Sequence, residues 1–259
     1  MIEIKNVTMI FNQDMPKEDW RIALDDVSLN IEDGDFITVI GGNGSGKSTL
    51  LNLISKSFAP TSGDILFFGK NIKDMNTSEH SSLVGRVFQD PKMGTAGNMS
   101  IIENLELAIR RGEKRTLKWG FTKEHEEEFK NLLAPLNLNL ETRLEQKVGV
   151  LSGGQRQALT LLMATLKKPS LLLLDEHTAA LDPKTASKVL TLTNKIVTEN
   201  KLTTLMITHN IKDALLYGNR LIMMYNGHIV MDVRGKEKED LTMEDIYAKF
   251  DEMDQVLMA

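Results

Sequence analysis

The chain has 259 residues, of which 41% are hydrophobic and 26% are charged, with a formal net charge of -5 and no cysteine. This composition is typical of a globular chain that is long enough to bury a sizeable core. The net negative charge argues against a protein that coats nucleic acid, and the absence of cysteine excludes disulfides and thiolate metal sites. The N-terminal segment lacks the features of a signal peptide, and the longest apolar runs are too short to span a membrane, so we expect a cytosolic location.

Runs with a β pattern alternate with helical runs along most of the chain, which predicts an α/β fold with a mostly parallel sheet. The beginning differs from this pattern. IEIKNVTMIF at 2–11 and IALDDVSLNI at 22–31 show near alternation and flank the polar stretch NQDMPKEDW at 12–20. These two runs predict a small antiparallel β part, to which we also assign DILFFGKNI at 64–72.

The strongest local motif is GGNGSGKST at 41–49, which lies between the apolar run FITVI and the helical run STLLNLI. It matches the phosphate-binding loop in both pattern and context, because glycines between a strand and a helix let backbone amides curl around a phosphate. Lys47 is expected to reach the β- and γ-phosphates, and Ser48 to ligate Mg²⁺. The nucleotide-binding residues predicted from this motif are Gly41, Gly42, Asn43, Gly44, Ser45, Gly46, Lys47, Ser48 and Thr49.

A second motif is the run SLLLLDE at 170–176. Its four leucines predict a strand that is buried on both faces and that ends in Asp175 and Glu176. In open α/β sheets ligands bind beyond the carboxyl ends of the strands. Asp175 is therefore predicted to hold Mg²⁺, and Glu176 to polarise the attacking water as the catalytic base.

Two further predicted strands, SLVGRVFQ at 82–89 and TTLMITH at 203–209, place Gln89 and His209 at their carboxyl ends. We expect Gln89 to contact Mg²⁺ or the attacking water. We expect His209 to donate a hydrogen bond to the γ-phosphate. The contacts of both side chains would then depend on whether the third phosphate is present.

Between these strands lies a highly charged segment, RRGEKRTLKWGFTKEHEEEFKNLL at 110–133, which predicts surface helices. We interpret residues 1–259 as a single domain in which about residues 95–165 form an inserted helical subdomain. The tail GKEKEDLTMEDIYAKF at 235–250 predicts a loop, a cap at Asp240 or Thr242, and one amphipathic terminal helix.

The sequence LSGGQ at 151–155 precedes the helix-forming run RQALTLLMATL. A serine and two glycines at a helix start offer hydrogen-bond donors and a positive dipole end to a phosphate. The alternative is a glycine-rich helix cap without a ligand. The chain therefore has two phosphate-directed motifs about a hundred residues apart.

In chain order, GGNGSGKST, Gln89, LSGGQ, LLLLDE, AALD at 179–182 and His209 resemble the motifs of ATP-binding cassette (ABC) ATPases over nearly the whole chain. The resemblance implies a P-loop NTPase fold with a central mostly parallel sheet, a small antiparallel β subdomain and an inserted α-helical subdomain. It implies ATP and Mg²⁺ as cofactors, and a homodimer paired head to tail in which the LSGGQ of one chain closes over the ATP of the other. The residues that would close over it are Ser152, Gly153, Gly154 and Gln155.

The resemblance also assigns single residues. Phe11 is similar to the aromatic residue that stacks on adenine, although Trp20 competes for this role. Asp182 resembles the residue that couples the two ATP sites. His177 departs from the family, which usually has proline after the glutamate, and we expect a local loop difference there with hydrolysis retained.

For the work that hydrolysis drives, the leading hypothesis is the energising subunit of a membrane transporter, bound to separate transmembrane permease subunits at the cytoplasmic face of the membrane. DPKMGTAGNMSIIENL at 90–105 would line the groove that receives a permease helix. The chain resembles importer subunits that work with an extracytoplasmic solute-binding protein for aromatic amino acids such as tryptophan or tyrosine. Exporters, and soluble ABC ATPases that act on DNA or ribosomes, remain alternatives. A P-loop small-molecule kinase would leave LSGGQ and His209 unexplained.

Overall fold

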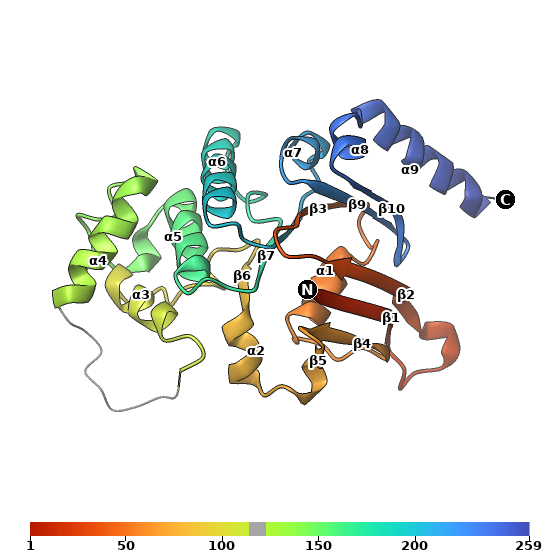
Figure 1. Ribbon diagram of the computed structural model, residues 1–259, viewed down its shortest axis with the longest axis horizontal. Helices are drawn as coiled ribbons and strands as arrows, with labels where there is room; N and C mark the ends of the chain where they lie inside the picture. The colour runs from red at the N-terminus through yellow and green to blue at the C-terminus, as the bar shows by residue number, and fades with distance from the viewer. Residues whose placement is uncertain (114–122, 259) are drawn as a thin grey trace. The chain divides into compact units, whose positions relative to one another are not determined.

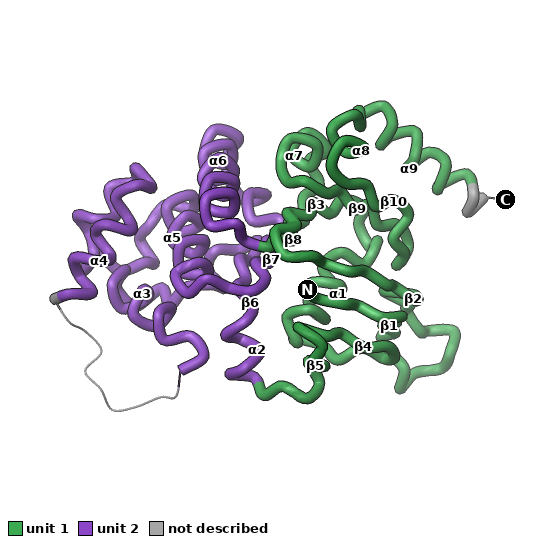
Figure 2. Tube along the Cα trace, viewed as in Figure 1, with its two compact units in different colours: residues 1–76, 203–259 green, residues 77–202 purple. Residues whose placement is uncertain are grey.

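The computed structural model describes residues 1–113 and 123–258 of the chain. The fold divides into two compact units, coloured separately in Figure 2. Unit 1 comprises Met1–Asn76 and Thr203–Ala259, and unit 2 comprises Thr77–Leu202. Each motif of the sequence lies wholly within one of the two units.

Unit 1 contains the predicted antiparallel part. Its strands, in the spatial order β2-β1-β4-β5, are β1 (Ile2–Phe11), β2 (Arg21–Ile31), β4 (Ser62–Phe67) and β5 (Lys70–Asn71). Ile4 on β1 is in register with Leu29 on one side and Ile65 on the other, and all three side chains are buried. The alternation in the sequence therefore reflects one face of this sheet turned toward a core.

A second group of strands in unit 1 carries the phosphate loop. Its strands, in the order β10-β9-β3-β8, are β3 (Phe36–Ile40), β8 (Thr204–Ile207), β9 (Arg220–Tyr225) and β10 (His228–Arg234). β3 is parallel to both β8 and β9, and every residue of β3 is buried. The helices of this unit are α1 (Lys47–Ile54), α7 (Ile211–Leu216), α8 (Lys236–Glu239) and α9 (Met243–Met258).

The tail corrects one expectation. Residues 236–239, which we predicted as loop, form the short helix α8. The cap of the terminal helix, expected at Asp240 or Thr242, is Thr242. Its hydroxyl oxygen accepts a hydrogen bond from the Asp245 amide at 3.2 Å, and the Asp245 carboxylate accepts one from the Thr242 amide at 2.9 Å. This reciprocal pair caps the predicted terminal helix α9.

Unit 2 contains two parallel strands and most of the helices. Its elements are α2 (Thr77–Leu83), β6 (Val84–Val87), α3 (Ile101–Ile109), α4 (Lys123–Leu133), α5 (Gly153–Thr165), β7 (Leu171–Asp175) and α6 (Pro183–Glu199). Short 3-10 turns occur in both units at Lys17–Asp19, Ile72–Asp74, Ala134–Leu136 and Val148–Val150. The strand predicted at 82–89 is shorter in the structure, because residues 82 and 83 end α2.

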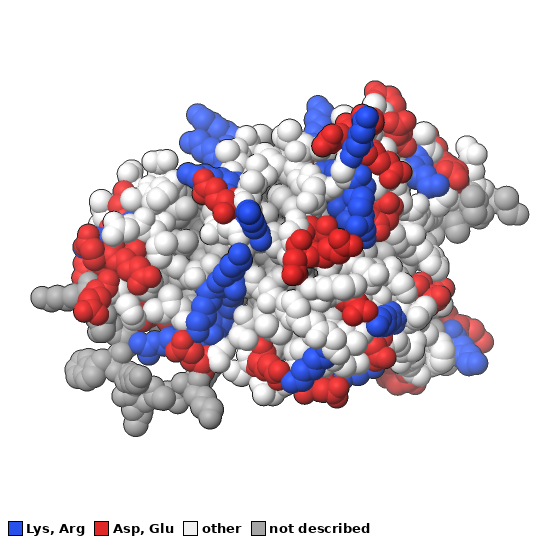
Figure 3. Space-filling model, in the orientation of Figure 1, with Lys and Arg blue, Asp and Glu red and all other residues white. Residues whose placement is uncertain are grey.

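Helices α3, α4 and α5 lie side by side in unit 2 (Figure 1). They share a core of buried side chains that includes Leu105, Phe129, Leu140 and Leu159. Of the charged segment at 110–133, the structure describes α4 and the residues just after α3, whereas residues 114–122 lie outside the described part. In that described part, no helix is both long and apolar enough to cross a membrane. Acidic and basic side chains are interspersed on the face drawn in Figure 3.

Candidate functional site

The phosphate loop of unit 1 connects the buried strand β3 to helix α1. Two of its glycines are required by the backbone. Gly41 has φ 154° and Gly46 has φ 100°, in the region that glycine adopts most readily. A Cβ on Gly41 would lie 2.3 Å from the carbonyl oxygen of Met224, and one on Gly46 would lie 2.6 Å from that of Ala23. Glycine is therefore needed at these positions for the loop to pack closely against β9 and β2.

Lys47 begins α1 and is 7% exposed. Its Nζ atom lies 2.8 Å from the carbonyl oxygens of Gly41 and Gly42 and 3.3 Å from the hydroxyl oxygen of Ser45. The ammonium group is thus folded back over its own loop, where carbonyl oxygens compensate for its burial. Ser48 follows at the first turn of α1 with an exposed side chain, as the Mg²⁺ prediction requires.

The two candidate adenine platforms have different surroundings. Phe11, the last residue of β1, packs edge-on against Phe58, with ring centroids 5.7 Å apart. Trp20 donates a hydrogen bond from Nε1 to the Met15 carbonyl oxygen at 3.0 Å, and the Lys17 ammonium lies 5.8 Å from the centroid of its ring. Each ring is thus held by neighbours of its own, and Phe11 stays the predicted stacking residue, with Trp20 as the alternative.

His209 follows the carboxyl end of β8 and is exposed. The turn around it is fixed, since the Asn210 amide donates to the Thr208 hydroxyl at 3.0 Å and the Asn210 side chain caps α7. Val39 on β3 is in parallel register with Ile207 on β8. His209 and the phosphate loop therefore lie at the same edge of these strands, as we predicted from strand ends alone.

In unit 2, Gln89, Asp175 and Glu176 lie beyond the carboxyl ends of two parallel strands, β6 and β7. Val87 on β6 is in parallel register with Leu174 on β7, so the residues that follow the two strands lie at the same end. The side chain of Gln157 donates a hydrogen bond to the carbonyl oxygen of Phe88 at 3.2 Å, which holds the backbone before Gln89 against α5.

Asp175 has a partner that our sequence reasoning missed. The Nη2 atom of Arg86 lies 2.9 Å from Oδ2 of Asp175, and the two side chains are only 13% and 15% exposed. The Arg86 guanidinium also lies 4.7 Å from the centroid of the Phe88 ring. The pair fixes one carboxylate oxygen of the predicted Mg²⁺ ligand, which is typical of outer-shell groups around metal sites.

The donors predicted for Mg²⁺ fit that ion in chemical type. Ser48, Gln89 and Asp175 offer hydroxyl, amide and carboxylate oxygens, which are the ligands that Mg²⁺ prefers. The described residues contain no group of three or more His, Cys, Asp or Glu side chains that could hold a metal ion. Mg²⁺ is usually bound by one or two carboxylates together with water and substrate phosphates, and Asp175 is the carboxylate among these donors.

Glu176 adopts φ 44°, a left-handed conformation that is uncommon for a residue other than glycine. Its carbonyl oxygen accepts a hydrogen bond from the Ala179 amide at 2.9 Å. The next residue, His177, is 2% exposed, and burial lowers its pKa to about 4. The imidazole is therefore neutral at physiological pH. Backbone strain of this kind persists where surrounding structure enforces it, and it is concentrated at functional sites.

The LSGGQ segment forms a complete helix cap. Ser152 caps α5 by accepting from the Gln155 amide at 3.3 Å, and the Gln155 side chain accepts from the Ser152 amide at 3.1 Å. A Cβ on Gly154 would lie 2.2 Å from Cγ2 of Thr185 on α6, so this glycine has a packing reason of its own. Because Ser152 and Gly153 remain exposed at the helix start, the cap is compatible with a ligand there.

Asp182, predicted to couple the two ATP sites, is the N-cap residue of α6. Its Oδ1 atom accepts a hydrogen bond from the Thr185 amide at 3.1 Å. Hydrogen bonds from Thr185 hold the pKa of the Asp182 carboxyl below its usual range. The side chain is therefore ionised and oriented at the start of the helix.

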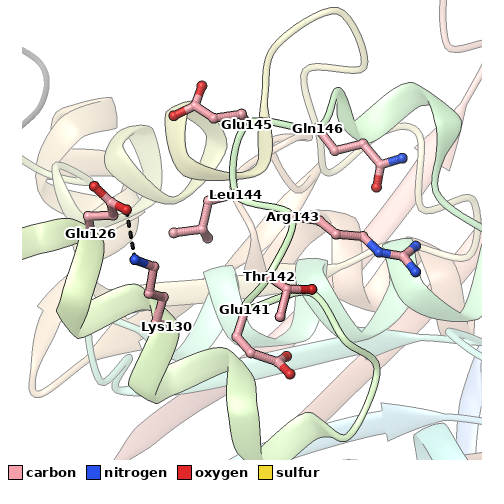
Figure 4. Close-up of a pocket in the computed structure, with 8 residues that line it drawn as sticks. All are labelled: Glu126, Lys130, Glu141, Thr142, Arg143, Leu144, Glu145 and Gln146. Atoms are coloured by element: carbon pink, nitrogen blue, oxygen red, sulfur yellow. Dashed lines mark ion pairs between the residues drawn. The ribbon is translucent and has the colours of Figure 1, made fainter.

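Unit 2 also has a hollow of about 540 Å³ beside α4 (Figure 4). Lys130 pairs with Glu126 at 2.8 Å on one wall. The lining residues are Glu126, Lys130, Glu141, Thr142, Arg143, Leu144, Glu145 and Gln146. None of them belongs to a predicted motif, and we assign this hollow no part in nucleotide chemistry.

The class of P-loop nucleoside triphosphatases is defined by two features that this chain has. The first is a strand followed by a glycine-rich loop, a lysine and a helix, and the second is a carboxylate pair after a buried strand. The ABC transporter family matches residues 24–179 of this chain. The chain therefore belongs to the ABC transporter family, as its ATP-binding subunit, and it is an ATP hydrolase.

Several curated relatives match almost end to end, including the two that follow. The Tyrosine transport ATP-binding protein of Clostridioides difficile is 47% identical over 251 residues, covering 97% of this chain and 99% of the relative. The Phosphonates import ATP-binding protein PhnC 3 of Halalkalibacterium halodurans is 31% identical over 253 residues, covering 96% of this chain and 95% of the relative.

Among solved structures, the dimeric post-hydrolysis state of the ATP-binding cassette MJ0796 bound to ADP and Pi, from Methanocaldococcus jannaschii, is similar to this chain. The TM-score is 0.75 at 31% identity, covering 90% of this chain and 98% of that one. The fold predicted from the sequence, a P-loop NTPase with a central mostly parallel sheet, a small antiparallel β subdomain and an inserted α-helical subdomain, is thereby confirmed.

Proposed function

We propose that this chain powers the import of an aromatic amino acid through separate permease subunits at the cytoplasmic face of the membrane. The observation that carries the proposal is the 47% identity, along nearly the full length of both chains, to a tyrosine transport ATP-binding protein. Similarity to a phosphonates import ATP-binding protein supports the import direction. In this proposal an extracytoplasmic solute-binding protein delivers the amino acid, and no nucleic acid takes part.

The catalytic roles follow from the motifs. Glu176 accepts a proton from the attacking water, and its position after a fully buried strand holds it on a rigid element. Lys47 stabilises the β- and γ-phosphates, and His209 donates a hydrogen bond to the γ-phosphate. Ser48, Gln89 and Asp175 hold Mg²⁺, which would neutralise phosphate charge when bound.

We also propose that two copies pair head to tail. The observation in support is the dimeric structure of the similar cassette MJ0796. In this arrangement Ser152, Gly153 and Gly154 of one chain donate to the γ-phosphate of the ATP on the partner chain. Loss of the γ-phosphate then removes contacts across the interface, which couples hydrolysis to opening.

The permease contact is assigned to the segment at 90–105, within a helical subdomain of about residues 95–165. This segment is firmly attached to α3. The Asn104 side chain accepts from the Ala96 amide at 2.8 Å and donates to the Ser100 carbonyl oxygen at 2.8 Å. Met93, in contrast, is 70% exposed. A segment that is attached to a helix and presents a large exposed apolar side chain is suited to dock a partner helix.

The test is co-purification with the membrane proteins encoded beside the gene, followed by mass spectrometry. A polytopic permease should be recovered with the wild-type chain. Met93→Glu should lose the permease, whereas Met15→Glu, a change at another exposed methionine, in unit 1 and 49% exposed, should retain it. Recovery of ribosomal or DNA-repair proteins in place of a permease would support the soluble class of ABC ATPase. Uptake of tyrosine by vesicles with the assembled complex then tests the substrate and the direction.

A further inference from the structure

Arg21 lies next to the proposed adenine platform. It is the first residue of β2 and is in antiparallel register with Phe11, the last residue of β1. Side chains of directly opposed residues in an antiparallel pair project from the same face and are neighbours. Arg21 and Phe11 therefore extend from the same side of this two-stranded ribbon.

Arg21 also reaches the phosphate loop. Its Nη2 atom lies 3.9 Å from the position that a Cβ on Gly44 would occupy, and no other atom outside the adjoining residues lies within 4 Å of that position. Gly44 is the central glycine of the loop, with φ 80°. The guanidinium group thus stands beside the open side of the loop, whereas Lys47 is buried and bonded to the loop's own carbonyl oxygens.

Within the described part of the chain, the Arg21 guanidinium has no hydrogen-bond or ion-pair partner, and the residue is exposed. This contrasts with Arg220 of the same unit, which is bonded to Asp35 and Asp232. An arginine has several donors in a planar fork, and this geometry matches phosphate oxygens. The charge of Arg21 is therefore available to a ligand on the loop.

We propose that Arg21 is a phosphate-binding residue of the nucleotide site, which contacts the phosphate chain of ATP from the open side of the loop. The proposal rests on the proposed function, in which Lys47 of the loop at 41–49 holds the phosphates, and on the sequence prediction that adenine stacks on Phe11. A nucleotide with its base on Phe11 and its phosphates on the loop would lie next to the Arg21 guanidinium group. Arg21 supplies a second cation for the phosphates in addition to Lys47.

The experiment measures binding of ATP and of pyrophosphate, in the presence of Mg²⁺, by displacement of a fluorescent ADP analogue from the purified chain. Pyrophosphate is informative because it has neither base nor ribose. Arg21→Gln should weaken both ligands by about fivefold or more, as expected for loss of a hydrogen bond to a charged group at an accessible site. Arg21→Lys should recover part of this loss, and the effect should shrink at high salt.

Two comparison variants make the result specific. Phe11→Leu should weaken ATP but not pyrophosphate. Arg234→Gln removes another exposed arginine, which lies at the end of β10. Arg234 is in register with Arg220 at the start of β9, whereas the phosphate loop packs against Met224 near the end of β9. This substitution should change neither affinity.

The inference is overturned if Arg21→Gln weakens ATP but leaves pyrophosphate unchanged, or if it changes both ligands no more than Arg234→Gln. Lys47→Ala separates this failure from failure of the proposed function. If Lys47→Ala binds both ligands normally, the phosphates do not lie on residues 41–49 at all. If Lys47→Ala weakens both and Arg21→Gln weakens neither, only the role of Arg21 is wrong.

Discussion

The Nε2 atom of His177 lies 2.9 Å from the hydroxyl oxygen of Thr193, and both side chains are almost fully buried. This hydrogen bond joins the residue after Glu176 to the middle of α6. It gives a physical reason for histidine at the position where the family resemblance led us to expect proline. A buried imidazole with a buried partner holds the turn in place of a ring that restricts the backbone.

Thr193→Val should therefore destabilise the chain. The change leaves a buried nitrogen of His177 without its partner, which costs about 1–3 kcal/mol. The matched control is Thr191→Val on the exposed face of the same helix, where the hydroxyl bonds only to the Ser187 carbonyl oxygen. Urea unfolding measures both. Equal losses in the two variants would contradict a stabilising role for the His177 contact.

His177 also predicts a pH dependence of stability. Its pKa is about 4 in the folded chain and near 6.5 when unfolded, so between these values the unfolded state binds more protons. The free energy of unfolding should thus fall as the pH drops through this window, by about 2 kcal/mol from this residue between pH 7 and pH 5. His177→Gln keeps a side chain that can hydrogen-bond but does not titrate. It should lose less stability over that range than the wild type, and parallel profiles would exclude this role.

Arg220 is 2% exposed and joins several strands of unit 1. It pairs with Asp35 at 2.9 Å and Asp232 at 2.6 Å, and it donates to the Asn30 carbonyl oxygen at 2.7 Å. Arg220→Met leaves these acceptors unpaired and should cost about 3–5 kcal/mol. The control is Arg234→Gln, whose pair with Glu32 is exposed, and a loss within about 0.5 kcal/mol is expected there. Chemical denaturation that ranks the two variants equally would contradict the assigned importance of Arg220.

Glu176→Gln should retain ATP binding and slow turnover by at least about 100-fold, because an amide keeps the shape of the side chain but accepts the water's proton poorly. ATP should then hold the chain as a stable dimer. Turnover is measured by phosphate release, and association by size-exclusion chromatography with ATP and Mg²⁺. A variant with wild-type turnover would remove Glu176 from the role of base.

The sequence was sufficient for features that depend on local pattern. Four consecutive leucines predicted β7, and a glycine-rich run between a strand and a helix predicted the phosphate loop, because both signals lie within a few adjacent residues. α8 was missed because a four-residue helix has no periodicity to detect. The start of β6 was misplaced because Leu83 fits the pattern of a strand as well as the end of α2.

Contacts between distant residues could not be predicted in the same way. The pair of Arg86 with Asp175 depends on the register of β6 against β7, which the sequence does not specify. The approach of Arg21 to Gly44 likewise depends on the packing of β2 against the phosphate loop. Ser152 illustrates a different limit. The residues that form a helix cap and those that bind a phosphate are the same, so phosphate binding was preferred only because the other motifs of the chain support it.

In the proposed head-to-tail dimer, the LSGGQ of one chain serves the ATP bound to the other, and this is the central claim. It is tested most directly by mixing two inactive variants, Lys47→Ala and Ser152→Arg, and measuring ATP hydrolysis together with ATP-dependent dimerisation. In a head-to-tail dimer of the two variants, both defects fall in one composite site and the other site is entirely wild type. The mixture should therefore regain activity, or at least dimerise with ATP, when neither variant does so alone. If Ser152 instead served the ATP on its own chain, each chain would keep one defective site, and a mixture that neither hydrolyses nor dimerises better than the separate variants would contradict the claim.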